Sequence, residues 1–222
     1  MILRRDLALN GLLLLTLAGL MILSLTIGPL KLSAQEVISA LFHGDPQNLS
    51  SQSLAGIDRA ARLHLIVTEI RLPRVLLAII VGASLAVSGA ALQGLLRNPL
   101  AEPGLLGVSA SASLGAVLCL YFGLASISAW LLPVSAMFSA AVSTLLLALF
   151  ARRSASNLTL ILAGIGLSSL AAALISLAIN LAPTPTDVQD IVLWLMGSIA
   201  DRSFDDIRLC LPFALAGIGL LL

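Results

Sequence analysis

Long stretches without a charged residue dominate this chain and limit the folds that it can adopt. The longest runs from Pro103 to Ala151, and others run from Leu7 to Leu30, from Val75 to Leu96 and from Ser154 to Thr186. As a helix, Val75 to Leu96 would be about 33 Å long, enough to cross a hydrocarbon core of about 30 Å. Charged residues make up only 10% of the chain, whereas soluble domains carry about 25%. The pattern therefore predicts an all-α fold, a polytopic bundle of transmembrane helices.

Five full spans and a truncated sixth are expected from these stretches. Leu7 to Leu30 is longer than the apolar core of a signal peptide, so we expect it to be retained as the first helix. Residues 123–128 and Pro133 divide the longest stretch into a third and a fourth span, and residues 154–186 hold the fifth. The residues after Arg208 are too few to cross a membrane, so the sixth helix is expected to be cut off. No soluble domain is visible, and residues 1–222 are expected to form a single transmembrane domain that is incomplete at its carboxyl end.

Arginines in short loops indicate the orientation. If five helices alternate, residues 4–5, Arg97 and residues 152–153 fall on one side of the membrane. The positive-inside rule makes that side cytoplasmic, together with the amino terminus. The opposite side carries more Lys and Arg, but mostly in longer loops, where the rule has less weight.

A short helix outside the spans is expected after the first of them. Residues 33–36 read Ser-Ala-Gln-Glu, a capping box, and apolar residues on one helical face follow it: Val37, Ile38, Leu41 and Phe42. This pattern predicts a helix that lies at the membrane surface.

Two further helix starts follow the fifth span. Pro183 and Pro185 break the chain, and Thr186 is then expected to cap a helix over residues 187–197 at the outer surface. Ser203, followed by carboxylates at 205 and 206, marks the start of the truncated sixth helix.

Several function classes are excluded by composition. The formal net charge of +1 gives no basic field, so nucleic acid is not expected as a partner. The chain has one lysine and no Gly-x-x-x-x-Gly-Lys string, so it lacks the loop that cradles nucleotide phosphates. We therefore do not expect an enzyme, and any ATP-driven step must come from another polypeptide.

No metal site is expected either. Cys119 and Cys210 both lie in apolar stretches and are interpreted as buried small hydrophobic residues. His43 and His64 lie in a polar region, with Asp45 near the first, and we interpret them as solvated loop histidines rather than metal ligands.

The predicted spans contain no Asp, Glu, Lys, Arg or His. Carriers driven by protons place an ionisable group inside the membrane. The absence of one argues that energy is delivered from outside the bilayer. An ion-gradient-driven secondary carrier stays open as an alternative, because an ionisable residue in a missing helix would support it.

Small residues spaced by four form a ridge on the fifth span: Gly164, Ser168, Ala172, Ser176 and Asn180. One interpretation is close helix packing, since small residues let backbones approach. The other is the wall of a translocation path, for which Asn180 is the main support because an amide facing lipid is costly. Serines 135, 139 and 143 form a similar ridge on the fourth span, which we interpret as packing.

Polar residues mark both ends of the second span. Arg71 and Arg74 stand at its outer end, and Pro73 between them disfavours a continuous helix. They either anchor the helix at the interface or dock acidic residues of a soluble partner, since guanidinium groups pair carboxylates in fixed geometry.

The inner end of that span is followed by a turn for which a structural role is expected. Asn98 and Pro99 form a turn signal, and Pro103 suits the first turn of the third helix. Glu102 complements the positive end of that helix, and Gly104 begins a face of small residues.

The sequence of residues 71–109 also resembles that of a known family. Arg-Leu-Pro-Arg, an uncharged stretch, and then Asn98-Pro-Leu-Ala-Glu-Pro-Gly-Leu-Leu-Gly-Val-Ser109 resemble the permease subunits of the iron-chelate, haem and vitamin B12 class of bacterial ABC importers, the FecCD-type family. Weaker matches lie at residues 162–166 and 194–197. The resemblance covers nearly the whole chain and implies the amino-terminal two-thirds of a permease with about ten helices.

The resemblance implies a set of partners and a location. They are a second permease copy in a dimer, two cytoplasmic ATPase subunits that use ATP, and a periplasmic or lipid-anchored solute-binding protein, with the chain in the lipid of the bacterial inner membrane. The chain itself would bind no cofactor. The fifth helix would line the path between the two copies, and the outer arginines would receive glutamates of the binding protein.

Two points stay open in this resemblance. The solute is a ferric siderophore, haem or cobalamin, and residues 197–203 look closer to the iron-chelate branch. In the family, the segments that contact the ATPase follow the sixth span, so a non-functional truncated membrane fragment is a further alternative.

Overall fold

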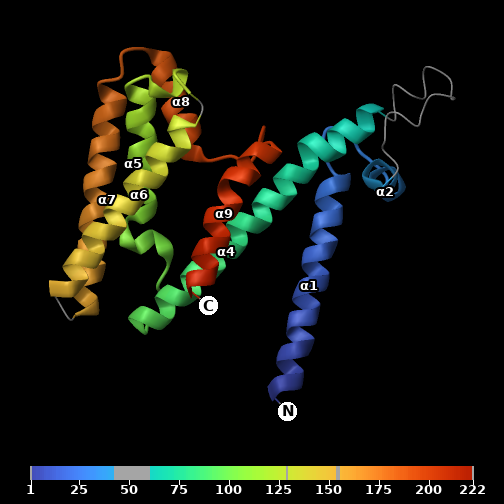
Figure 1. Ribbon diagram of the computed structural model, residues 1–222, viewed down its shortest axis with the longest axis horizontal. Coiled ribbons are helices and arrows are strands. Elements are labelled where there is room, and N and C mark those ends of the chain that lie inside the picture. The colour runs from blue at the N-terminus through green and yellow to red at the C-terminus, as the bar shows by residue number, and fades with distance from the viewer. Residues whose placement is uncertain (1, 43–60, 129, 154–155, 222) are drawn as a thin grey trace. The chain divides into compact units, whose positions relative to one another are not determined.

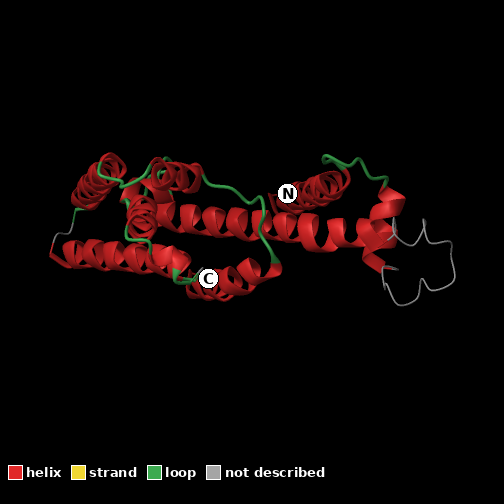
Figure 2. Cartoon of the chain, turned by 90° about the horizontal axis from the view of Figure 1, so that it is seen from above, coloured by secondary structure: helices red, strands yellow, loops and turns green. Residues whose placement is uncertain are grey.

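The computed structural model describes residues 2–42, 61–128, 130–153 and 156–221. Helices and short loops make up all of these residues, and none of them forms a strand, which confirms the all-α fold (Figure 2). In chain order the elements are α1 (Ile2–Thr26), α2 (Ala34–Phe42), η2 (Ile66–Arg71), α4 (Leu72–Leu96), η3 (Pro103–Leu106), α5 (Val108–Tyr121), η4 (Leu124–Ser126), α6 (Leu131–Arg153), α7 (Asn157–Asn180), α8 (Pro185–Met196) and α9 (Phe204–Leu221).

Four helices among the described residues are long and apolar enough to cross a membrane. They cover Leu7–Thr26, Ala61–Leu96, Leu131–Arg152 and Leu158–Asn180. The third expected span is shorter than anticipated, because α5 has 14 residues and is about 21 Å long. Glycines with left-handed backbones, Gly107 at φ 72° and Gly123 at φ 66°, bound this helix on both sides.

The second span begins earlier than the sequence predicts. Helical structure continues from Ala61 through Pro73 to Leu96, so the expected interruption at this proline is wrong. Residues Ile66–Arg71 form a π-helical turn immediately before it. A π-helical turn closes its hydrogen bonds over five residues instead of four, which leaves room for a ring that lacks an N–H group.

The chain divides into two compact units, and the division falls within α4. Unit 1 comprises Met1–Ala83 and Ile199–Leu220, and unit 2 comprises Ser84–Ser198 with the last two residues. Each unit has its own apolar cluster. The cluster of unit 1 consists of Leu25, Leu32, Val37, Ala40, Val67 and Val75, and that of unit 2 consists of Val117, Ala178 and Ile191.

In unit 2, α5 packs against both α6 and α7, and the three helices run side by side (Figure 1). A Cβ atom on Gly115 would lie 2.4 Å from the carbonyl oxygen of Ser135 and 2.6 Å from Cβ of Ser139. Ser143, further along α6, is 2% exposed. The serine ridge of the fourth span is therefore a packing surface, as its spacing predicts.

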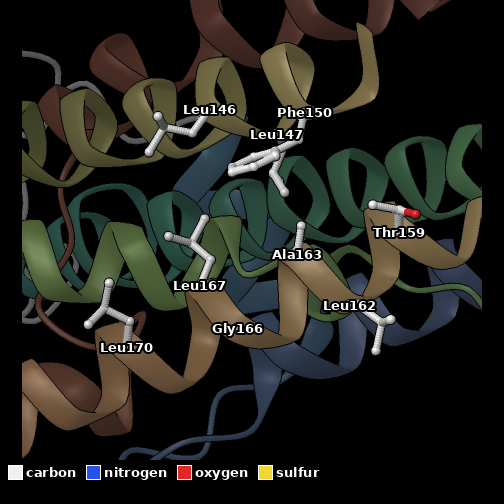
Figure 3. A pocket seen from close by; sticks show the side chains of 9 residues that line it. All are labelled: Leu146, Leu147, Phe150, Thr159, Leu162, Ala163, Gly166, Leu167 and Leu170. Carbon is white, nitrogen blue, oxygen red and sulfur yellow. The ribbon is translucent and has the colours of Figure 1, made fainter. Parts of the chain in front are cut away.

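An apolar groove of about 480 Å³ lies between α6 and α7 (Figure 3). Leu147 and Phe150 of α6 face Ala163 and Leu167 of α7 across it, and Thr159 is its one hydroxyl-bearing residue. Large apolar side chains at its edges, such as Phe150 at 54% exposure, are typical of a surface that meets lipid tails.

The short helix α2 begins with the expected capping box. The Ser33 amide donates to Oε2 of Glu36 at 2.8 Å, and the Glu36 amide donates to Oγ of Ser33 at 3.2 Å. Its apolar face is divided, because Val37 is buried in unit 1 whereas Ile38 and Phe42 are 55% and 79% exposed.

The cap of α8 differs from the prediction. Thr184, not Thr186, accepts the amide of Asp187, and Asp187 in turn accepts from the amide of Thr184. The reason is Pro185, which occupies the first helical position, so the helix begins two residues earlier in the chain than expected. The start of α9 is as expected, with the Ser203 amide donating to Oδ2 of Asp206 at 2.8 Å.

Candidate outer docking site, inner turn and α7 ridge

Arg71 and Arg74, the two arginines expected at the outer end of the second span, have different environments in unit 1. Arg71 is only 7% exposed, and its guanidinium donates to the carbonyl oxygens of Leu25 at 2.5 Å, Thr26 at 3.1 Å and Leu30. The first two carbonyls belong to the last turn of α1, where no amide of the helix can reach them. The positive charge also complements the negative end of that helix. Arg71 therefore caps α1 from within the unit.

Gly28 makes room for this cap. A Cβ atom at this position would lie 2.6 Å from Nη2 of Arg71. The role of Gly28 was not predicted from the sequence, although Ile27-Gly28-Pro29 carries the glycine and proline of a turn signal.

Arg74 is more accessible. Its side chain is 36% exposed, and Nη2 lies 3.4 Å from Oδ1 of Asp201, whose own side chain is 97% exposed. The Nε atom of Arg74 is buried and has no hydrogen-bond partner among the described residues. The pairing with Asp201 was not predictable from the sequence, because 127 positions separate this residue from Arg74 and no local pattern links the two.

A concavity of about 380 Å³ lies beside these arginines within unit 1. Its wall combines the turn after α1, including Gly28 and Pro29, with Arg71 and Arg74. Both Nη atoms of Arg71 donate to carbonyl oxygens of its own chain, whereas the Arg74 side chain is 36% exposed and more accessible to a carboxylate of another protein.

A local hydrogen bond closes the turn expected at the inner end of the second span, and its structural role stays a prediction. The Leu100 amide donates to Oδ1 of Asn98 at 2.9 Å, and Pro99 follows in the same turn. Pro103 begins the 3-10 helix η3 rather than α5 itself. Glu102 is exposed and makes no side-chain cap bond, so it contributes at most its charge to that helix end.

The first two residues of the small-residue ridge, Gly164 and Ser168, pack against the segment that follows this turn. A Cβ atom on Gly107 would lie 2.7 Å from the carbonyl oxygen of Gly164 and 2.8 Å from Oγ of Ser168. On Gly164 it would lie 2.7 Å from the carbonyl oxygen of Leu105. Gly104 itself is exposed and has only the Glu102 side chain near it. The first two ridge positions therefore serve helix packing.

The upper part of the ridge is exposed in this chain. Ala172, Ser176 and Asn180 all have accessible side chains on α7. Nδ2 of Asn180 donates to the carbonyl oxygen of Ser176 at 2.8 Å, which satisfies part of the amide within the helix. A path role for this ridge stays a prediction, and these three positions are the ones free to serve it.

The histidine and cysteine interpretations need correction. His64 lies in helical structure, not in a loop, and its Nδ1 is 2.7 Å from the carbonyl oxygen of Ala40. His43 and Asp45 lie outside the described residues. Cys119 is buried as expected, but Cys210 is exposed on α9. Within the described part of the chain, no three His, Cys, Asp or Glu residues gather as metal ligands do.

Taken together, these features are typical of a polytopic membrane permease: several apolar helices and tight packing between small residues. The family model of the FecCD transport family matches residues 14–222, and the chain therefore belongs to this family.

Individual relatives agree with the family match. The chain is 47% identical over 163 residues to the Bacillus subtilis (strain 168) protein YvrB, named an uncharacterized ABC transporter permease, with 71% of this chain and 45% of the relative covered. It is 44% identical over 138 residues to BtuC of Salmonella paratyphi A, a vitamin B12 import system permease, with 62% and 42% covered. The chain thus spans less than half the length of these curated relatives.

A solved structure shares the fold. It is classed as a metal-chelate type ABC transporter in an inward-facing conformation, and it matches with a TM-score of 0.70 at 34% identity. The match covers 90% of this chain and 56% of that one.

Proposed function

We propose that the chain acts as the membrane-spanning permease subunit of a binding-protein-dependent ABC importer in the bacterial inner membrane, with its amino terminus in the cytoplasm. The observation that carries this proposal is the family match over residues 14–222. Relatives named as permease subunits support it.

Energy for transport comes from a separate ATPase in this proposal. The stretches 75–96, 131–151 and 158–180 contain no ionisable residue, so they offer no site at which proton binding could drive transport. Two cytoplasmic ATPase subunits and a second permease copy complete the importer. The exposed upper ridge of α7, Ala172, Ser176 and Asn180, faces the path between the two copies.

The solute is an iron chelate, such as a siderophore or haem, or a cobalamin-like molecule. One relative is named for vitamin B12 import and the solved structure for metal chelates, so both classes have a counterpart. Small side chains along the α7 ridge suit a bulky solute, because they leave space and offer no strong binding group.

An uptake experiment tests the energy source and the solute together. The chain is expressed with candidate ATPase and solute-binding proteins from the same genome, and uptake of radiolabelled ferric siderophore, haem and cobalamin is measured. We expect uptake of one of them to be abolished by vanadate and to persist with a protonophore. Uptake that is abolished by the protonophore and unaffected by vanadate would contradict the importer and support a secondary carrier. No uptake of any solute would support a non-functional fragment.

Docking of the solute-binding protein is assigned to the outer arginines, and above all to Arg74. Its guanidinium is partly exposed, whereas that of Arg71 is bonded to backbone carbonyls. We expect Arg74→Glu to weaken binding of the soluble protein at least ten-fold, because a rim charge is replaced by a repelling one. Lys31→Glu, which reverses an exposed charge in the same unit, is the control. Equal losses in the two variants would remove the specific role of Arg74.

A further inference from the structure

Asp201 is placed where it can compete with a partner for Arg74. Its Oδ1 lies 3.4 Å from Nη2 of Arg74, within unit 1. The docking role proposed for Arg74 requires a carboxylate of another protein at that same guanidinium. Two carboxylates cannot both occupy one face of the group at full strength, so the internal one must be displaced or shared.

The backbone holds this carboxylate in a position that few residue types accept. Asp201 has φ 56°, in the left-handed region, where aspartate and asparagine are several-fold enriched among residues other than glycine. It stands in the short connection between α8 and α9. The neighbouring carboxylates are engaged elsewhere, since Asp205 pairs with Arg208 at 2.9 Å and Asp206 with Arg202 at 3.5 Å.

The ion pair between Arg74 and Asp201 is weak enough for a partner to displace it. Asp201 is 97% exposed, so water and salt screen its attraction to Arg74, and such a surface pair contributes little to stability. The Arg74 side chain also keeps a buried Nε without a partner among the described residues, so it has donor capacity that Asp201 does not use. Asp201 reaches Nη2 alone, so a partner carboxylate that reaches both Nη atoms would make the bidentate contact that the internal pair lacks.

We propose that Asp201 is an internal substitute for the partner's carboxylate, which holds Arg74 while no solute-binding protein is docked and lowers the affinity of docking. This inference rests on the proposed docking role of Arg74. It assigns to the α8–α9 connection a regulatory part: any movement of Asp201 toward or away from Arg74 changes how readily the binding protein docks and leaves.

The test measures binding of the solute-binding protein that supports uptake to the full chain in lipid nanodiscs. Asp201→Asn removes the charge, keeps the side-chain shape and suits the left-handed backbone, so the fold should be unaffected. We expect binding to become about two- to five-fold tighter at low salt, the size of a surface ion pair, and the gain to fade at high salt. Asp205→Asn is the matched control, because it removes the same charge from an exposed side chain that does not contact Arg74.

A double-mutant cycle separates the two proposals. In an Arg74→Gln background, Asp201→Asn should change the affinity no more than Asp205→Asn does. If Arg74→Gln alone leaves binding unchanged, the docking role itself fails. If Arg74→Gln weakens binding but Asp201→Asn and Asp205→Asn act equally, docking stands and the competition by Asp201 is overturned.

Phenylglyoxal, which modifies accessible arginines, gives a measurement that needs no partner. The rate of modification at Arg74, followed by mass spectrometry, should rise at least two-fold in Asp201→Asn and stay constant in Asp205→Asn. An unchanged rate in Asp201→Asn would show that Asp201 does not hold the guanidinium and would overturn the proposal.

Discussion

The two units of the chain hold their segments together in opposite ways. Unit 1 uses a charged side chain, the guanidinium of Arg71, which binds three backbone carbonyls and is 7% exposed. Unit 2 relies on glycines instead. Because Gly107, Gly115 and Gly164 have no side chain, neighbouring backbones come into direct contact. Both solutions need glycine, because Gly28 also makes room for the guanidinium.

The difference follows from what each contact must satisfy. In unit 2, whole helices lie against each other with their backbone groups already paired, so dispersion contacts at short range hold them. In unit 1, α1 ends at Thr26 and leaves carbonyls without helical partners, which would be costly in an apolar environment. A long cationic side chain solves that problem, and a glycine contact cannot. The contrast predicts which substitutions each unit tolerates.

The largest effect is expected at Gly107, where two demands coincide. Gly107→Ala would place a non-glycine residue at φ 72° and a Cβ atom 2.7 Å from the carbonyl oxygen of Gly164. We expect the free energy of unfolding to fall by about 2–4 kcal/mol, measured by titration with a denaturing detergent. Gly123→Ala is the control, since Gly123 has φ 66° but nothing within 4 Å of its added Cβ. If both variants lose the same amount, the close contact in unit 2 contributes nothing.

The contact of Arg71 with the carbonyls of unit 1 is expected to contribute slightly less to the free energy of unfolding. Arg71→Met keeps the length of the side chain but removes the guanidinium that donates to the carbonyls of Leu25, Thr26 and Leu30, and we expect the free energy of unfolding to fall by about 2–3 kcal/mol. Arg74→Met, three residues along the same helix, should lose no more than about 1 kcal/mol because its pair is exposed. The same detergent titration checks both variants. Similar losses in the two variants would mean that burial does not determine how much an arginine contributes to the free energy of unfolding.

Local patterns explain what the sequence could predict of this structure. The existence of α6 and α7 as separate helices, the capping box at Ser33 and the start of α9 depend on local sequence patterns, and all agree with the structure. The serine ridge of α6 was also predictable as packing, because its spacing of four places it on one helix face.

Contacts between distant segments could not be predicted. The cap on α1 joins residues 46 positions apart, and the Arg74–Asp201 pair joins residues 127 positions apart. Pro73 was expected to interrupt the helix because a proline usually does, but the π-helical turn before it accommodates the ring. The environment of Arg71 therefore follows from tertiary structure, although its string, Arg-Leu-Pro-Arg, was the clearest feature of the sequence.

A smaller effect is expected where unit 2 has a close contact but no backbone strain. Gly115 lies within α5, and the Cβ atom of Gly115→Ala would meet the Ser135 carbonyl oxygen at 2.4 Å. We expect a loss of about 1–2 kcal/mol, because α6 must move and the alanine itself favours a helix. Gly94→Ala, a helical position with nothing within 4 Å, should gain up to about 1 kcal/mol instead. Thermal unfolding in detergent gives the sign directly, and a gain in Gly115→Ala would show that α5 and α6 are not in close contact.

The smallest effect is expected at a helix cap of unit 2, where a polar side chain binds a backbone amide as Arg71 binds carbonyls in unit 1. Thr184 caps α8 at an exposed position, with Oγ1 accepting the Asp187 amide at 3.2 Å. We expect Thr184→Ala to lose about 1 kcal/mol, less than Arg71→Met, because water replaces the lost partner of an exposed amide but not that of the buried Leu25 carbonyl. Thr186→Ala removes a threonine from the first turn of the same helix and should lose less than about 0.5 kcal/mol. Hydrogen exchange at the Asp187 amide reports the cap directly. If Thr184→Ala lost as much as Arg71→Met, exposure would not distinguish the two bonds, and the contrast between the units would lie in residue type alone.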